Sequence, residues 1–260
     1  MSVAAATTNE TFRDRLLRRD LLLGSFGVEL AAAAVPEALA QSGFDLLIVD
    51  MEHSAFGLDQ VAQLVTACRA SGLASVVRVS DHSRSAITRV ADMWPDGIMF
   101  PGVESAEQAQ AIVEASKYAP IGSRGVCPMV RYSALPENRY EILNDRLALI
   151  LQIEGRAALA QAAAIANLAG VDALFVGTYD LSQSLGITGR VDDPRVLEAG
   201  RELRALLPET TALGVYVWSG EMARQWREAG ATLIAYATDA QLFLAGCRAA
   251  ASAAREGVPG

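Results

Sequence analysis

The fold is decided by one stretch, Phe44-Asp45-Leu46-Leu47-Ile48-Val49-Asp50-Met51-Glu52-His53. A run of four apolar residues, too short for a helix, ends abruptly in three ionisable side chains. This pattern is typical of a parallel strand that is buried on both faces and releases polar groups at its carboxyl end. In proteins built from βα units, ligands bind at that end of the strands. The stretch therefore predicts both a buried strand and a ligand site.

Seven further apolar runs repeat the pattern along the chain. Strands are predicted over residues 21–28, 45–49, 74–79, 97–100, 149–153, 173–176, 213–217 and 232–235. Helices are predicted over 8–19 (a lead-in helix capped by Thr8 or Asn9), 36–43, 58–71, 83–93, 105–117, 137–145, 156–168, 180–185, 194–206, 219–229 and 239–254. Eight strands alternating with helices predict an α/β fold, a (β/α)₈ TIM barrel, in one domain over residues 1–260.

Two features bear on that assignment. The rival fold, a doubly wound open sheet, usually carries a Gly-rich dinucleotide turn after its first strand. Gly24-Ser25-Phe26-Gly27 lacks the third glycine of that turn, which favours the barrel. Residues 118–147 contain several Pro and Gly residues and no clear strand, so they are predicted to form a long excursion between two barrel strands.

Composition limits the function. The net charge of −8 and the pI near 4.9 argue against nucleic acid or an anionic membrane as the main partner. The first ten residues lack the basic and apolar regions of a signal peptide, and no apolar run reaches the ~20 residues that cross a bilayer. We therefore expect a cytoplasmic protein. The three cysteines have no short spacing, which argues against a disulfide framework or a zinc site.

A divalent metal site is predicted from two acids. Glu154 follows the predicted strand 149–153, and Asp180 follows the next strand, 173–176. Adjacent parallel strands lie about 4.8 Å apart, so these carboxylates can converge on one cation. Two carboxylates with the other positions left to water and substrate suit Mg²⁺ or Mn²⁺. The alternative is that Asp180 caps a helix and Glu154 lies at a helix start.

Catalytic groups are predicted on the same rim. Asp50 and His53 form a candidate acid–base pair, because an Asp that bonds a histidine raises its basicity. Arg78, at the end of strand 74–79, suits the stabilisation of an oxyanion, with a salt bridge to Glu52 or Glu154 as the alternative. The other histidine, His82, is expected to be a solvated loop residue or a helix cap.

The spacing of these motifs resembles that of the HpcH/HpaI aldolase family, the metal-dependent pyruvate aldolases. The resemblance covers roughly residues 20–250. It is carried by Phe44-Asp45 to His53, Val77-Arg78, Gly122-Ser123-Arg124-Gly125-Val126, Gln152-Ile153-Glu154 and Gly177-Thr178-Tyr179-Asp180-Leu181-Ser182. The chain departs from the family at Met51, Gly155 and Thr178-Tyr179, and residues 127–140 also differ. These departures surround the substrate pockets, so they affect substrate identity more than metal binding.

The resemblance implies a role for each matching residue. Glu154 and Asp180 would bind Mg²⁺ or Mn²⁺, with Co²⁺ as a further candidate, beside Gln152. Pyruvate would chelate the ion, Arg78 would stabilise the enolate, and Gly177 and Thr178 would hold the substrate carboxylate. Asp50 and His53 would move the aldol proton. The last helix would pack on a neighbouring subunit of a homo-oligomer, commonly a hexamer, with Asp92 reaching across an interface.

The basic residues support a metal rather than a Schiff base. Of the 22 basic residues only Lys117 is a lysine, and it lies at the end of a predicted helix, away from the rim. The predicted function is therefore a class II aldolase that cleaves or forms 4-hydroxy-2-oxo acids from a 2-oxo acid and an aldehyde. Two alternatives stay open: a citrate-lyase-like acyl-CoA lyase, with Arg131 and Arg139 binding CoA, and a non-catalytic barrel that binds 2-oxo acids.

Overall fold

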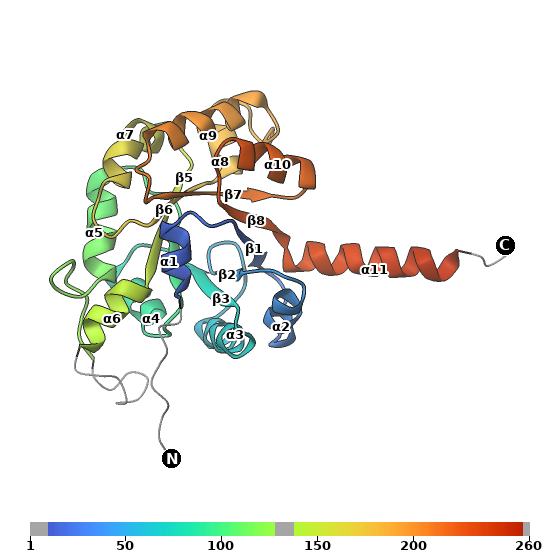
Figure 1. Ribbon diagram of the computed structural model, residues 1–260, viewed down its shortest axis with the longest axis horizontal. Helices are drawn as coiled ribbons and strands as arrows, with labels where there is room; N and C mark the ends of the chain where they lie inside the picture. Colours follow the sequence, from blue (N-terminus) through green and yellow to red (C-terminus); the bar gives the residue numbers. More distant parts are fainter. Residues whose placement is uncertain (1–9, 128–137, 257–260) are drawn as a thin grey trace, which may run out of the picture.

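The computed structural model describes residues 10–127 and 138–256. Eight parallel strands pair in chain order and close into a barrel through β1 and β8, which confirms the predicted TIM barrel (Figure 1). The strands are β1 (Leu22–Gly27), β2 (Leu46–Asp50), β3 (Ala74–Arg78), β4 (Gly97–Phe100), β5 (Ala148–Ile153), β6 (Ala173–Val176), β7 (Ala212–Val217) and β8 (Leu233–Thr238). Each predicted strand is present, with ends that differ by up to three residues.

Helices cover the outside of the barrel. They are α1 (Phe12–Leu17), α2 (Ala34–Gln41), α3 (Leu58–Ser71), α4 (Arg84–Ala91), α5 (Ala106–Ser116), α6 (Arg139–Arg146), α7 (Arg156–Ala166), α8 (Thr178–Ser184), α9 (Pro194–Leu206), α10 (Gly220–Glu228) and α11 (Asp239–Arg255). The predicted cap of the first helix is corrected. Thr11 caps α1, because its hydroxyl accepts from the Asp14 amide while Asp14 bonds back to Thr11. Thr8 and Asn9 lie outside the described residues.

Two apolar layers hold the barrel together. One fills the barrel interior and includes Ile48, Val76 and Phe175, and the other lies between the strands and the surrounding helices. Small residues make room for large ones in the interior. A Cβ at Gly214 would lie 2.4 Å from the Phe175 ring, so a glycine is required there for that ring to fill the barrel centre.

The amino-terminal end of the barrel is closed. Phe12 and Leu16 of α1 join the interior cluster, and α6 packs beside α1. Lys117, at the end of α5, is buried there and donates to the carbonyls of Asn144 and Leu147. Its position away from the carboxyl rim is confirmed. Residues 128–137 of the predicted excursion lie outside the described part of the chain.

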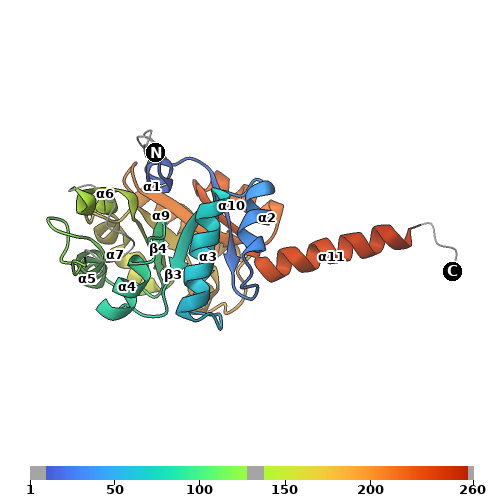
Figure 2. The same ribbon diagram turned by 90° about the horizontal axis from the view of Figure 1, so that it is seen from below.

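The last helix, α11, extends away from the barrel (Figures 1 and 2). It contacts β1 and β8, and its Gln241 accepts a hydrogen bond from the hydroxyl of Tyr216 in β7. Phe243 and Leu244 leave 65% and 47% of their surface exposed. Within the described ranges, no helix is long and apolar enough to span a membrane.

Candidate active site

A cavity of about 410 Å³ opens at the carboxyl ends of the strands. The parallel register brings polar residues from separate strands to this one end, as the sequence predicted. Seven of the eight predicted site residues line it, namely Asp50, His53, Arg78, Gln152, Gly177, Thr178 and Asp180. The eighth, Glu154, lies directly behind the wall, where its side chain contacts Gly177 and Gln152.

Arg78 is the cation at the centre of this site. Asp50 and Arg78 are direct partners in the β2–β3 register, and Arg78 donates to both Asp50 carboxylate oxygens at 2.8 and 2.6 Å. Arg78 also pairs with Glu52 at 2.8 Å and lies over the Phe26 ring, 5.0 Å from its centroid. The predicted alternative, a salt bridge to Glu52, is therefore present. This bidentate pairing fixes the direction of the guanidinium.

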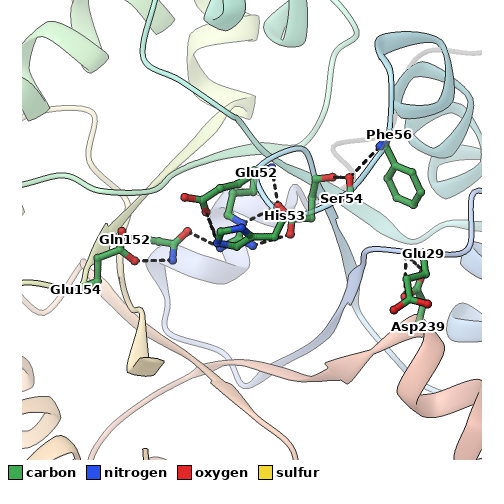
Figure 3. Close-up of polar contacts among 10 residues, drawn as sticks. Glu29, Glu52, His53, Ser54, Phe56, Gln152, Glu154 and Asp239 are labelled. Carbon is green, nitrogen blue, oxygen red and sulfur yellow. Dashed lines mark hydrogen bonds and ion pairs between the residues drawn. The ribbon is translucent and has the colours of Figure 1, made fainter. Parts of the chain in front are cut away.

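The predicted contact between Asp50 and His53 is not formed in the structure. Strand register places Asp50 opposite Arg78, which takes both carboxylate oxygens. His53 instead lies in the turn after β2, 68% exposed, with its Nε2 3.8 Å from a Glu52 oxygen (Figure 3). Burial raises the pKa of Glu52, although Arg78 and His53 both oppose that rise. The ionisable neighbour of His53 in this structure is therefore Glu52.

Glu154 is held from two sides. Its Oε1 accepts from the Gly102 amide at 2.5 Å. Its Oε2 accepts from Gln152 Nε2 at 3.2 Å (Figure 3). Gln152 in turn accepts from Arg78 at 3.4 Å. A Cβ on Gly177 would lie 2.3 Å from Glu154 Oε2, so only glycine leaves space for this carboxylate. The side chain is thus fixed by main-chain and side-chain contacts from three strand ends.

The negative charge of Glu154 is only weakly balanced by nearby positive charge. Burial raises the pKa of Glu154 from its ordinary 4.5 to about 7, the Gly102 hydrogen bond opposes this, and the charges of Asp180 and Glu52 add to it. Asp180 lies in the first turn of α8 and lines the cavity. Arg78, the nearby cation, is already paired with two other acids. A cation placed between Glu154 and Asp180 would relieve this imbalance.

Glu154 and Asp180 can supply only part of the coordination shell of a divalent ion. Among residues 10–127 and 138–256, no group of three or more His, Cys, Asp or Glu side chains is arranged to hold a metal. Glu154 and Asp180 supply two hard oxygen donors, which suit Mg²⁺ or Mn²⁺ when water and substrate complete the shell. The donor chemistry therefore fits the predicted ion.

Thr178 carries an unused hydrogen-bonding group in the cavity wall. Its side chain is 2% exposed, and its Oγ1 has no hydrogen-bond partner in the structure. Buried polar groups are normally paired, so an unpaired hydroxyl in a cavity points to a bound ligand. Thr178 and Gly177 lie where β6 enters α8, and the role of their backbone amides in binding a carboxylate stays a prediction.

Aromatic rings form another side of the cavity, which sequence reasoning did not identify. Phe26, Tyr216 and Tyr179 line it, and Trp218 bridges the two tyrosines with ring centroids 6.1 and 6.2 Å away. Their positions at or just after the ends of β1, β6 and β7 are the only signal that the sequence offered for them. The cavity thus has one polar side and one aromatic side.

Two further groups near Glu154 were also not predicted. The Gly102 amide follows β4 and binds the carboxylate directly. His82 lies in the half-exposed loop before α4 and does not cap that helix: it bonds Pro101 and Gln108, while Ser83 caps α4. These contacts form between loops that are distant in sequence, so no local sequence pattern predicts them.

Comparisons with known proteins agree with this geometry. Residues 26–245 match the model of the HpcH/HpaI aldolase/citrate lyase family. The chain is 35% identical over 254 residues to the hydroxypyruvate/pyruvate aldolase of Paraburkholderia phytofirmans, covering 94% of this chain and 97% of that protein. It is 32% identical over 244 residues to the 2-keto-3-deoxy-L-rhamnonate aldolase of Klebsiella pneumoniae, covering 92% and 90%.

Solved structures show the same fold. A HpcH/HpaI aldolase/citrate lyase family protein from Burkholderia cenocepacia superposes with a TM-score of 0.86 and 32% identity, covering 94% of this chain and 98% of that one. The citrate synthase SbnG superposes with a TM-score of 0.83 and 26% identity, covering 95% and 98%. Similarity to named aldolases over most of the chain identifies the protein as a lyase of the aldolase type. The chain belongs to the HpcH/HpaI aldolase/citrate lyase family.

Proposed function

We propose that the protein is a divalent-metal-dependent aldolase that cleaves and forms 4-hydroxy-2-oxo acids. The enolate donor is pyruvate or a similar 2-oxo acid, and the acceptor is an aldehyde. The observation that carries the proposal is Glu154, a partly buried carboxylate whose pKa burial raises to about 7 and on which the charge of Asp180, a residue of the cavity lining, acts in the same direction. Lys117, the one lysine, is buried at the opposite end of the barrel, so a Schiff base has no amine in the cavity.

Glu154 and Asp180 would hold Mg²⁺, Mn²⁺ or Co²⁺. When bound, the ion acidifies the methyl group of a chelated 2-oxo acid and neutralises the charge that develops on its keto oxygen. Gln152 keeps Glu154 in place by donating to its Oε2. The unpaired Thr178 hydroxyl would donate to the substrate carboxylate, which satisfies a group that is otherwise buried without a partner.

Arg78 stabilises negative charge on the reacting keto oxygen. Its guanidinium stays cationic at any working pH and is held in one direction by Asp50. His53, at the exposed mouth of the cavity, would carry the aldol proton between the substrate and solvent, with a water molecule between it and Asp50. Glu52 holds His53 near the cavity through their 3.8 Å contact.

Deuterium exchange into the methyl group of pyruvate tests enolisation without knowledge of the aldehyde. We expect exchange by wild-type protein with Mn²⁺ or Mg²⁺, and none after EDTA treatment or in Glu154→Gln and Asp180→Asn. Undiminished exchange in EDTA would contradict the metal dependence. Tight pyruvate binding without exchange in the metal-loaded protein would instead support the non-catalytic binding barrel.

The acyl-CoA alternative receives less support from the structure. Arg139 lies on α6, which packs beside α1 at the amino-terminal end of the barrel, away from the cavity. Arg131, the other residue considered for CoA, lies outside the described residues. Cleavage of the carbon–carbon bond of citryl-CoA by the metal-loaded protein, without aldol cleavage of 4-hydroxy-2-oxo acids, would favour this alternative.

We also propose that the protein is a homo-oligomer in which α11 packs on a neighbouring subunit. The helix extends from the barrel with Phe243 and Leu244 exposed, and a second copy of the chain would cover them. Asp92, expected at an interface, accepts from Arg124 of the same chain at 2.5 Å. Light scattering should report an oligomer, a hexamer on the family pattern, that dissociates in the double variant Phe243→Glu and Leu244→Glu.

A further inference from the structure

His82 connects two loops at the carboxyl rim of the barrel. It lies in the segment between β3 and α4, and its ring packs edge-on against Phe100, with centroids 5.9 Å apart. Its Nε2 lies 2.7 Å from the Pro101 carbonyl oxygen, and its Nδ1 lies 2.9 Å from Gln108 Nε2. Both ring nitrogens are therefore bonded, which is unusual for a histidine in a half-exposed loop.

The partners of His82 determine its tautomer. Gln108 Oε1 accepts from the Glu104 amide at 2.9 Å, so the nitrogen of that side-chain amide must face the histidine. Gln108 thus donates to Nδ1, which acts as an acceptor. The proton of the neutral ring then resides on Nε2, which donates to Pro101 O. This arrangement gives the ring one defined donor, Nε2, and one defined acceptor, Nδ1.

Pro101 O and the Gly102 amide belong to the same peptide group. His82 donates to the oxygen of that peptide group, and the Gly102 N–H of the same group donates to Glu154 Oε1 at 2.5 Å. A hydrogen bond to the carbonyl oxygen polarises the peptide and makes its N–H a stronger donor. Gly102 has a φ of +60°, a backbone conformation that L side chains rarely take and that glycine adopts readily.

We propose that His82 is a positioning residue that acts through the 101–102 peptide to orient Glu154 for the divalent ion. On the other side of the carboxylate, Arg78 and Gln152 form a corresponding chain of contacts. The two chains together set the direction of both Glu154 oxygens. The inference rests on the proposed role of Glu154 as a metal ligand. His82 itself does not touch the cavity, the ion or the substrate.

Mn²⁺ affinity tests this role directly, measured by electron paramagnetic resonance of free Mn²⁺ for the full chain. His82→Gln retains one N–H donor at the reach of Nε2 and one acceptor for Gln108. His82→Asn has the same amide on a side chain one methylene shorter, so it does not reach Pro101 O. We expect His82→Asn to weaken Mn²⁺ binding about tenfold, the usual scale for loss of a group that orients a ligand, while His82→Gln stays close to wild type.

A second measurement does not depend on the metal. In metal-free protein, the Gly102 amide proton should move upfield in the NMR spectrum of His82→Asn and remain in place in His82→Gln. Equal Mn²⁺ affinity and an unchanged Gly102 resonance in a folded His82→Asn would overturn the proposal.

The metal assignment has its own control. If Glu154→Gln binds Mn²⁺ as tightly as wild type, or if wild type binds none, the proposed metal site itself fails and His82 loses this role with it. If wild type binds through Glu154 and His82→Asn does so equally well, only the role of His82 fails.

Discussion

Glu154→Gln should stabilise the metal-free protein while it removes metal binding. Burial raises the pKa of Glu154 from 4.5 to about 7, so the folded state binds this proton more tightly than the unfolded chain does. Each pKa unit corresponds to about 1.4 kcal/mol, so the ionised carboxylate costs the fold about 3 kcal/mol at pH 8. Because part of the side chain remains in contact with solvent, we expect a net gain of about 2 kcal/mol for the amide.

The sign of the pH dependence follows from the same pKa. The cost is absent below pH 4.5, grows as the pH rises toward 7, and is fully present above it. In EDTA at pH 8, thermal unfolding of Glu154→Gln should occur about 4–8 °C above that of wild type, and the difference should shrink at pH 5. Saturating Mn²⁺ should add its free energy of binding to the stability of wild type and so raise its unfolding midpoint. The midpoint of Glu154→Gln should stay unchanged.

Asp193→Asn is a matched control outside the cavity. Side-chain hydrogen bonding from Arg195 lowers the pKa of Asp193 to about 2, so its ionised form supports the fold, and the amide should lower stability at neutral pH. The reasoning would be refuted if Glu154→Gln were less stable than wild type in EDTA at pH 8. It would also be refuted if Mn²⁺ stabilised both proteins equally.

Three further results are expected. Arg78→Ala should lower the rate of pyruvate deuterium exchange ~10²-fold or more at saturating Mn²⁺, because it removes an oxyanion partner; an unchanged rate would remove Arg78 from the mechanism. Uncharged aldehydes should have a higher kcat/KM than succinic semialdehyde, which carries a carboxylate. The reason is that Arg78 is the only Arg or Lys among the described residues that line the cavity, and it is already paired with acids. The reverse order in an aldehyde panel would contradict this. Burial lowers the pKa of Lys117 from 10.5 to about 8, so the stability of wild type should rise between pH 8 and 10.5 relative to that of Lys117→Met. If urea denaturation gave both proteins the same change in unfolding free energy over that range, the expectation would be wrong.

Local sequence was sufficient for the barrel. Each strand is a short apolar run with a clear end, as in 46–49, and each is followed by a helix with its own stop, as at Gly72. Because the barrel repeats this βα unit, local sequence patterns predict most of it without knowledge of contacts between distant residues. The rim was predictable for the same reason, because parallel strands deliver their carboxyl ends to one side.

Pairings across the rim depended on tertiary structure. Asp50 and His53 are close in sequence, yet strand register gives Asp50 to Arg78 and leaves His53 beside Glu52. The support of Glu154 by the Gly102 amide, and of that peptide by His82, joins loops after β3, β4 and β5. The sequence was enough to place the predicted polar residues at the rim, because strand ends are local features. Which of these residues touch follows from strand register and loop packing, and both are set by the whole barrel.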